Sequence, residues 1–327
     1  MAQVYNRIFD PEKYKKVNKE SKNMIEDYIM ELRSQKKSNG TISQYNNDLR
    51  IFAIYCLDKC ENKSFLELTK RDIRNFVLYC SDEWKMSNAR VNRIMSSIRT
   101  ILSFAEDDDE EYEDYDRNVA AKIKGLPKES VREVVFIPDD VILKLWDKLM
   151  LEKRYKEATL LGILYDSGAR RNEILQVRRD AITVNGNSTN IVKGKRGKMF
   201  RVLYFRLTKE AFKEYDKERK DKCELLFVTS AGSPATAGTI YEMVTKWKKD
   251  LNELTGEEYN LNVHSFRHCF IENMTNGTHY LCREMNLGKV AIEKVKILAH
   301  HSDVSTTDSY RSNDEEKDIE ELFGIKL

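Results

Sequence analysis

Apolar side chains recur at steps of three and four residues in four stretches near the start of the chain. This spacing places them on one face of a helix and therefore predicts four amphipathic α-helices. Thr41, which follows Asn39-Gly40, is expected to be the N-cap of the second helix. Four such helices predict a small helical bundle. The expected helices cover about 22–36, a stretch from about 41, 68–79 and 87–104.

A different periodicity appears in the second half, where residues 182–205 alternate β-branched and polar side chains around Asn185-Gly186 and Lys193-Gly194. Such alternation is typical of a short antiparallel sheet with glycine-containing turns. Helical spacing surrounds it, so this half is expected to be α+β and the chain as a whole mainly α with a small antiparallel sheet. The expected helices lie near 139–149, 155–167, from 209, 238–254, 264–276, 289–298 and 315–323.

An acidic run separates the two halves, since nine of the eleven residues 106–116 are Asp or Glu. The simpler interpretation is a solvated connector; the alternative is an acidic flap that competes with an anionic ligand for a basic groove. The stretch that follows contains the turn Gly125-Leu126-Pro127 and is interpreted as an interdomain linker. The expected organisation is a tail (1–19), a helical domain (20–117), a linker (118–134) and a second domain (135–327).

Composition narrows the class of protein. The 327 residues are 41% hydrophobic and 34% charged, and no apolar run reaches the roughly 18 residues that a membrane span requires. The first ten residues carry charge early and do not form a signal peptide, so the six cysteines are expected to be reduced thiols in the cytoplasm. The net charge of +2 identifies no partner by itself.

Three arginines of the fourth predicted helix fall outside its apolar stripe: Arg90, Arg93 and Arg99. We expect them to point outward and to be available to the phosphates of an anionic partner, because guanidinium groups bind phosphates well. The alternative is that they form the ordinary solvated face of an amphipathic helix.

All five histidines lie in the last 64 residues, within or near segments that carry candidate chemistry. Four segments, each unremarkable by itself, occur in a fixed order. They are Ser167-Gly168-Ala169-Arg170-Arg171-Asn172-Glu173-Ile174, Lys193-Gly194-Lys195, His264-Ser265-Phe266-Arg267-His268, and Leu298-Ala299-His300-His301 running on to Thr306-Thr307-Asp308-Ser309-Tyr310.

Together these segments resemble the catalytic domain of tyrosine recombinases, the phage integrase family that includes the Xer recombinases. The family's motifs read roughly T-G-x-R-x-x-E-L, K-G-x-K, H-x-x-R-H and L-G-H-S-x-x-x-T-T-x-x-Y. Counting back nine residues from Tyr310 reaches His301, so His300 stands where the family usually has glycine. The predicted bundle also resembles the family's helical core-binding (SAM-like) domain, which implies the simple two-domain form.

The resemblance implies that Arg170 and Arg267 hold the non-bridging oxygens of a DNA phosphate. Attack on a phosphodiester builds negative charge on these oxygens, and guanidinium forks stay protonated throughout. His264 and His301 can each offer an imidazole N–H to the same phosphate, and His264 is a candidate acceptor of the nucleophile's proton.

The same resemblance implies that Tyr310 is the nucleophile and that Lys193 is the general acid for the leaving 5′-oxygen. An unperturbed tyrosine has a pKa of about 10 and needs a cationic pocket to become reactive. The covalent 3′-phosphotyrosine conserves the energy of the broken bond, so neither a metal nor another cofactor is expected.

Three of these residue assignments have an alternative that the sequence does not exclude. Lys195 and Lys198 share the predicted hairpin with Lys193. Glu173 is expected to support the site by accepting hydrogen bonds, but a purely structural role is equally open. His268 lies one helical turn from His264 and forms a zinc pair with it only if further ligands exist, and the sequence offers none convincingly.

The implied partner is a double-stranded DNA recombination site, bound by a homotetramer, with a monomer as a possible free state. Tetramers of the family exchange their C-terminal segments, and the apolar residues of the tail would dock on a neighbour: Ile319, Leu322, Phe323 and Ile325. The alternative is a tail that folds onto its own domain. Two rival functions stay open, a type IB topoisomerase-like nicking enzyme and a non-catalytic DNA-binding regulator on the same scaffold.

Overall fold

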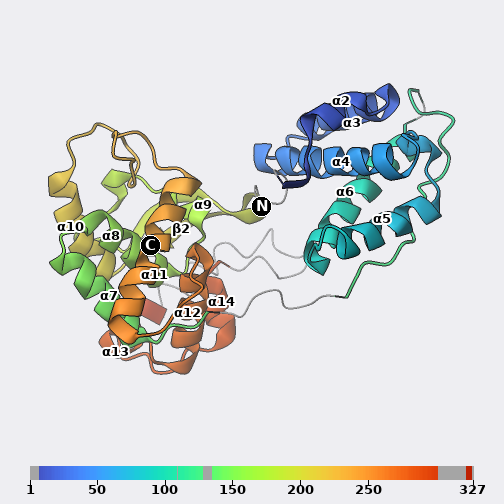
Figure 1. Cartoon of the computed structure of the whole chain (residues 1–327). Coiled ribbons are helices and arrows are strands. Elements are labelled where there is room, and N and C mark those ends of the chain that lie inside the picture. Colours follow the sequence, from blue (N-terminus) through green and yellow to red (C-terminus); the bar gives the residue numbers. More distant parts are fainter. Residues whose placement is uncertain (1–6, 109, 128–134, 301–321, 326–327) are drawn as a thin grey trace. The chain divides into compact units, whose positions relative to one another are not determined.

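A computed structural model describes residues 7–108, 110–127, 135–300 and 322–325 (Figure 1). The chain divides into two compact units, Met1–Glu133 and Val134–Leu327. The fold class predicted from the sequence, mainly α with a small antiparallel sheet, is confirmed. The finer division into tail, helical domain, linker and second domain stays a prediction.

The first unit is a helical bundle around one apolar core. All four predicted helices are present, and polar caps fix where they begin. The second helix begins at Asn39 because Ser38 caps it by accepting a hydrogen bond from the Thr41 backbone N–H. The predicted N-cap, Thr41, is therefore wrong, and it lies inside the first turn. The helices are α2 (Pro11–Lys16), α3 (Lys19–Ser34), α4 (Asn39–Lys59), α5 (Lys70–Asp82) and α6 (Asn88–Glu106).

The acidic segment after α6 packs against this bundle. Tyr112 and Tyr115 are buried, and the Tyr112 hydroxyl donates a hydrogen bond of 2.6 Å to Asp27. The next stretch also packs back, since Ala120 is fully buried and the Asn92 amide donates to the Leu126 carbonyl at 2.9 Å. The segment is more than a solvated connector, because its aromatic side chains contribute to the core.

The expectation that the three arginines of α6 point outward is wrong. Arg90 and Arg93 both pair with the fully buried carboxylate of Asp48 on α4, at 2.7 Å and 3.0 Å. Arg99 donates to backbone carbonyls of the segment after α6, the closer being that of Ile123 at 2.8 Å. The face that looked polar in the sequence is covered by α4 and by residues 118–127, so these guanidinium groups have partners inside the unit.

The second unit is built on α8 (Tyr155–Ser167), whose residues 158–167 are all buried. Helices α7, α10 and α12 pack against it. Strands β1 (Ser188–Lys193) and β2 (Met199–Leu203) form an antiparallel hairpin. The other elements are α7 (Asp139–Leu151), α9 (Arg171–Ile174), α10 (Arg206–Glu218), α11 (Ala237–Thr255), α12 (Val263–Asn276), α13 (Tyr280–Glu284) and α14 (Ile292–Leu298).

The short helix α13 was not predicted from the sequence. His279 caps it: the Nδ1 atom accepts from the Leu281 backbone N–H at 3.1 Å. The Nε2 atom lies 3.1 Å from the Tyr165 carbonyl of α8, to which it donates. Because the ring is fully buried and Nδ1 acts as an acceptor, the neutral form fits this place, and burial lowers the pKa of His279 to about 4.

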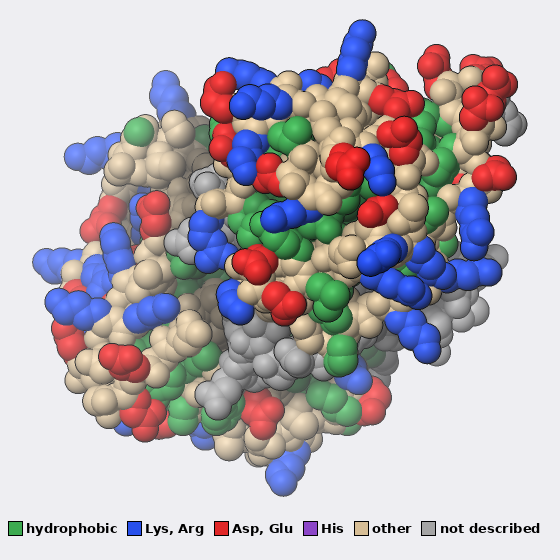
Figure 2. Space-filling view, turned by 45° about the vertical axis from the view of Figure 1, so that its right-hand side comes forward, with side chains coloured by type: hydrophobic (Ala, Val, Ile, Leu, Met, Phe, Trp, Pro, Cys, Tyr) green, Lys and Arg blue, Asp and Glu red, His purple; other side chains and the backbone are tan. Residues whose placement is uncertain are grey.

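Charged side chains of both signs share the face seen in Figure 2, in keeping with the small net charge of the chain. Every helix in the part of the chain that the structure describes is too short or too polar to cross a lipid bilayer.

We predict that Asp48→Ala lowers the free energy of unfolding of the first unit by about 3–5 kcal/mol, the scale for removing one partner of a buried ion pair. Two partly buried guanidinium groups would lose their counter-charge. The matched control is Asp58→Ala, which breaks a partly exposed pair with Lys13 and should cost less than about 1 kcal/mol. Urea unfolding measures both, and equal losses would contradict this view of Asp48.

A second prediction concerns the pH dependence of stability. The folded protein binds the His279 proton more weakly than the unfolded chain does, so stability from this group is present above pH 6.5 and is lost as pH falls towards 4. The parent should lose roughly 3 kcal/mol more than His279→Asn between pH 7 and pH 4. Asparagine can still cap α13 but does not titrate. Parallel unfolding curves for the two proteins across this range would contradict the assignment.

Candidate active site

Arg170 is held in place by the turn between α8 and α9. Helix α8 ends at Gly168, whose φ of 61° lies in the left-handed region, and a Cβ there would lie 2.6 Å from the Phe270 ring. Arg170 then caps α9, and Glu173 accepts hydrogen bonds from its backbone N–H at 2.6 Å and from its Nη1 at 3.1 Å. Nη1 also donates to the His300 carbonyl at 3.1 Å.

Arg267 is the most unusual polar side chain of the second unit, since only 1% of it is exposed. Its Nη1 donates to the Gly168 carbonyl at 2.7 Å. Nε and Nη2 have no hydrogen-bond partner among the described residues. Burial, followed by the positive charge of Arg170, lowers the pKa of Arg267 to about 10.

The two guanidinium groups together favour an anionic ligand. Buried donors without partners cost free energy, and like charges at close range repel each other. Glu173 opposes this repulsion only in part, because it is already bonded to Arg170. A phosphate fits the arrangement because its oxygens accept several hydrogen bonds and carry the missing charge.

His264 and His268 lie one turn apart on α12. The Asn262 side chain caps this helix and accepts from the His264 backbone N–H at 2.9 Å. The His264 side chain is exposed and lines the cavity described below, and its ring lies 4.7 Å from that of His268. Burial and the neighbouring Arg267 lower the pKa of His268, which favours a neutral ring. No cluster of three metal-ligating side chains occurs among the described residues.

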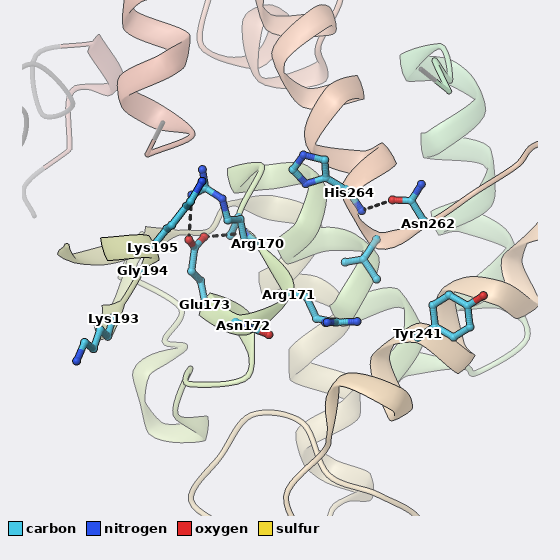
Figure 3. A pocket seen from close by; sticks show the side chains of 12 residues that line it. Arg170, Arg171, Asn172, Glu173, Lys193, Gly194, Lys195, Tyr241, Asn262 and His264 are labelled. Atoms are coloured by element: carbon cyan, nitrogen blue, oxygen red, sulfur yellow. Dashed lines mark hydrogen bonds and ion pairs between the residues drawn. The ribbon is translucent and has the colours of Figure 1, made fainter. Parts of the chain in front are cut away.

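The hairpin places Lys193 on its exposed face, where it is paired with Met199 of β2. Lys193 lines the same cavity as Arg170, but in Figure 3 its side chain points away from Arg170. Lys195 follows in the turn and lines the same cavity, and Lys198 precedes β2. The choice among the three lysines therefore stays open.

A cavity of about 520 Å³ is lined by Arg170, Glu173, Lys193, Lys195 and His264 (Figure 3). Sequence reasoning missed four of its polar residues: Arg171, Asn172, Tyr241 and Asn262. Asn262 had a recognisable signal, because an asparagine just before a helix is a good N-cap. Tyr241 had none, since it comes from the distant helix α11.

The predicted residues His301 and Tyr310, and Ile319 of the tail, lie outside the described residues. The chain is nevertheless described up to His300, whose carbonyl accepts from Arg170. The segment that contains the last motif therefore leaves from the edge of the arginine site.

Comparisons with known proteins agree with this arrangement. The model of the phage integrase family matches residues 126–317, and that of the phage integrase N-terminal SAM-like domain matches residues 25–108. The SPbeta prophage-derived recombinase-like protein YomM of Bacillus subtilis is 24% identical over 330 residues, covering 95% of this chain and 92% of the relative. Tyrosine recombinase XerD of Staphylococcus haemolyticus is 23% identical, covering 88% and 92%.

Solved structures share the fold. XerH site-specific recombinase bound to a palindromic difH substrate aligns with a TM-score of 0.58 at 19% identity, covering 92% of this chain and 83% of that one. A lambda integrase dimer bound to a core site aligns with a TM-score of 0.61 at 15% identity, covering 88% and 98%.

Proposed function

The chain belongs to the phage integrase family, and from this premise we propose that it is a site-specific recombinase that cuts and rejoins DNA strands through a 3′-phosphotyrosine. The observation that carries the proposal is the pair Arg170 and Arg267: Arg170 lines the cavity, and buried Arg267 is close enough for the charge of Arg170 to lower its pKa. Two nitrogens of Arg267 have no hydrogen-bond partner among the described residues. The substrate is a double-stranded DNA recombination site, and the solved relatives bound to such sites support this choice.

In the proposed reaction the Tyr310 oxygen forms a bond to phosphorus while the bond from phosphorus to the 5′-oxygen breaks. Arg170 and Arg267 hold the two non-bridging oxygens, on which charge increases in the transition state. Each preorganised donor of this kind contributes roughly two to three orders of magnitude in rate. The structure supports this role because Arg267 is buried and its Nε and Nη2 atoms have no hydrogen-bond partner among the described residues. These donors are therefore available to a phosphate.

Protons move at both ends of the reaction. His264, exposed at the cavity, accepts the tyrosine proton or donates an N–H to the phosphate, and His301 supplies a second N–H. A lysine of the hairpin gives its proton to the 5′-oxygen as the strand leaves. Lys193 is the family's choice, and its side chain would turn towards the cavity that the residue lines. Glu173 positions Arg170, and His268 supports His264 as a neutral neighbour.

We also propose that the protein acts as a homotetramer on DNA, with a monomer as its free state, and that both units contact one duplex. Among the described tail residues, Phe323 packs 5.0 Å from Phe205 in the core of its own unit, together with Leu322 and Ile325. These described tail residues thus fold onto their own domain, which is the alternative that the sequence left open. The same apolar site is suited to receive the tail of a neighbouring subunit in the tetramer. The arginines Arg90, Arg93 and Arg99 are weaker candidates for DNA contact, because their guanidinium groups already have internal partners.

The rival functions are less well supported. A topoisomerase-like enzyme would not need the matched N-terminal domain of integrases. A non-catalytic regulator would have no need to keep Arg170, Glu173, His264 and Arg267 around one site.

We predict that Tyr310→Phe binds DNA but forms no covalent protein–DNA adduct, because the attacking oxygen is missing. The substrate is a duplex from the neighbouring genomic sequence with a nick close to the cleavage site. Cleavage then frees a short fragment with a 5′-hydroxyl, and its loss prevents religation and traps the adduct. Denaturing gels measure the adduct and gel shifts measure binding. Tyr259→Phe is the matched control and should keep the adduct, because the Tyr259 hydroxyl bonds to Glu257 and the residue does not line the cavity. An undiminished adduct in Tyr310→Phe would contradict the nucleophile, and relaxation of supercoils lacking the site would favour the topoisomerase-like alternative.

A further inference from the structure

His300 occupies the position where the family usually has glycine, and its backbone shows why glycine suits it. Its φ of 49° lies in the left-handed region, which costs a residue with a Cβ roughly 1 kcal/mol. The side chain is also 93% buried, and neither ring nitrogen makes a well-formed hydrogen bond within the described chain. A strained backbone and an unpaired buried side chain at one residue indicate that the imidazole ring has a functional role.

The ring stacks on Phe200 of strand β2. The two ring centroids are 3.7 Å apart with an interplanar angle of 22°. Burial, with Lys198 and Arg267 nearby, lowers the pKa of His300 to about 3, although the Arg201 backbone opposes the shift. The imidazole is therefore neutral and packs as an aromatic ring.

Phe200 in turn covers the turn of the hairpin. A Cβ on Gly194 would lie 2.5 Å from the Phe200 ring and 3.4 Å from the Glu173 carboxylate, so only glycine allows this approach. Gly194 directly follows Lys193, and its N–H donates to the Lys198 carbonyl at 2.7 Å. The Phe200 ring thus packs directly against the lysine-bearing turn.

These contacts form a continuous ring of neighbouring residues that begins and ends at His300. The His300 carbonyl accepts from Arg170, Arg170 is bound by Glu173, and Glu173 borders Gly194. From Gly194 the contacts return through Phe200 to the His300 ring. One residue therefore connects the arginine site, through its backbone, to the hairpin, through its side chain.

We propose that His300 is a positioning residue that holds the β1–β2 hairpin against the arginine site, so that a hairpin lysine can protonate the leaving 5′-oxygen. This inference rests on the proposed function but not on which of the three lysines acts. A glycine at this place would keep the backbone and lose the ring, leaving Phe200 without its partner.

The test compares two DNA substrates. In one the scissile phosphate is normal; in the other the bridging 5′-oxygen is replaced by sulfur. A thiol has a pKa of about 8.5, so a sulfur leaving group departs as a thiolate and needs no proton from the enzyme. A defect confined to delivery of the lysine proton must therefore disappear on the sulfur substrate.

We expect His300→Gly to cleave the normal substrate roughly tenfold to a hundredfold more slowly than the parent, the scale for misplacing a reacting group by about 1 Å. On the sulfur substrate it should match the parent. His300→Phe restores a neutral ring for the stack and should recover most of the rate on the normal substrate. Phe200→Leu, which removes the other ring, should repeat the His300→Gly pattern.

The matched control is Asn286→Gly, which relaxes another left-handed residue of the same unit at an exposed place and should leave both rates unchanged. Thermal unfolding checks that each variant is folded. An equal defect of His300→Gly on both substrates, or no defect on either, would overturn the proposal. Failure of the parent to cleave either substrate would instead contradict the proposed function.

Discussion

The burial of Arg267 beside a second cation, Arg170, is the constraint on which the rest of the site depends. Protein contacts hold both groups: Glu173 and the His300 carbonyl bind Arg170, and the Gly168 carbonyl binds Arg267. These contacts fix the two guanidinium groups without supplying the negative charge that would satisfy both. A phosphate that binds between them accepts their hydrogen bonds and supplies the missing negative charge. Its interaction with the two groups is strongest in the transition state, when the negative charge on its oxygens increases.

The fold maintains this arrangement by bringing buried helix ends together. Helix α8 ends at Gly168, beside the point where α12 carries Arg267, and the Gly168 carbonyl binds Arg267 directly. Below them, His279 ties α13 to α8 through two hydrogen bonds. The cost of enclosing an arginine is therefore offset by a rigid surrounding core rather than by a local counter-charge.

The sequence predicted the parts of this site that depend on order along the chain, and it failed where distant segments meet. Motif spacing placed Arg170, Glu173, His264 and Arg267 in one site, and the structure brings these four together. Periodicity treated the arginines of α6 as solvent-facing, because it cannot see that Asp48 and residues 118–127 cover them. The resemblance to the family motif identified His300 as an unusual residue but could not find its partner, since the stack on Phe200 joins residues 100 positions apart.

The most direct test of the central claim replaces one non-bridging oxygen of the scissile phosphate with a methyl group, which removes the negative charge. If Arg267 serves to neutralise that charge, Arg267→Ala should cleave the normal phosphate roughly two to three orders of magnitude more slowly than the parent. On the neutral methylphosphonate, the same variant should come within about tenfold of the parent, because the charge that Arg267 would balance is gone. An unchanged ratio between variant and parent on the two substrates would contradict the account.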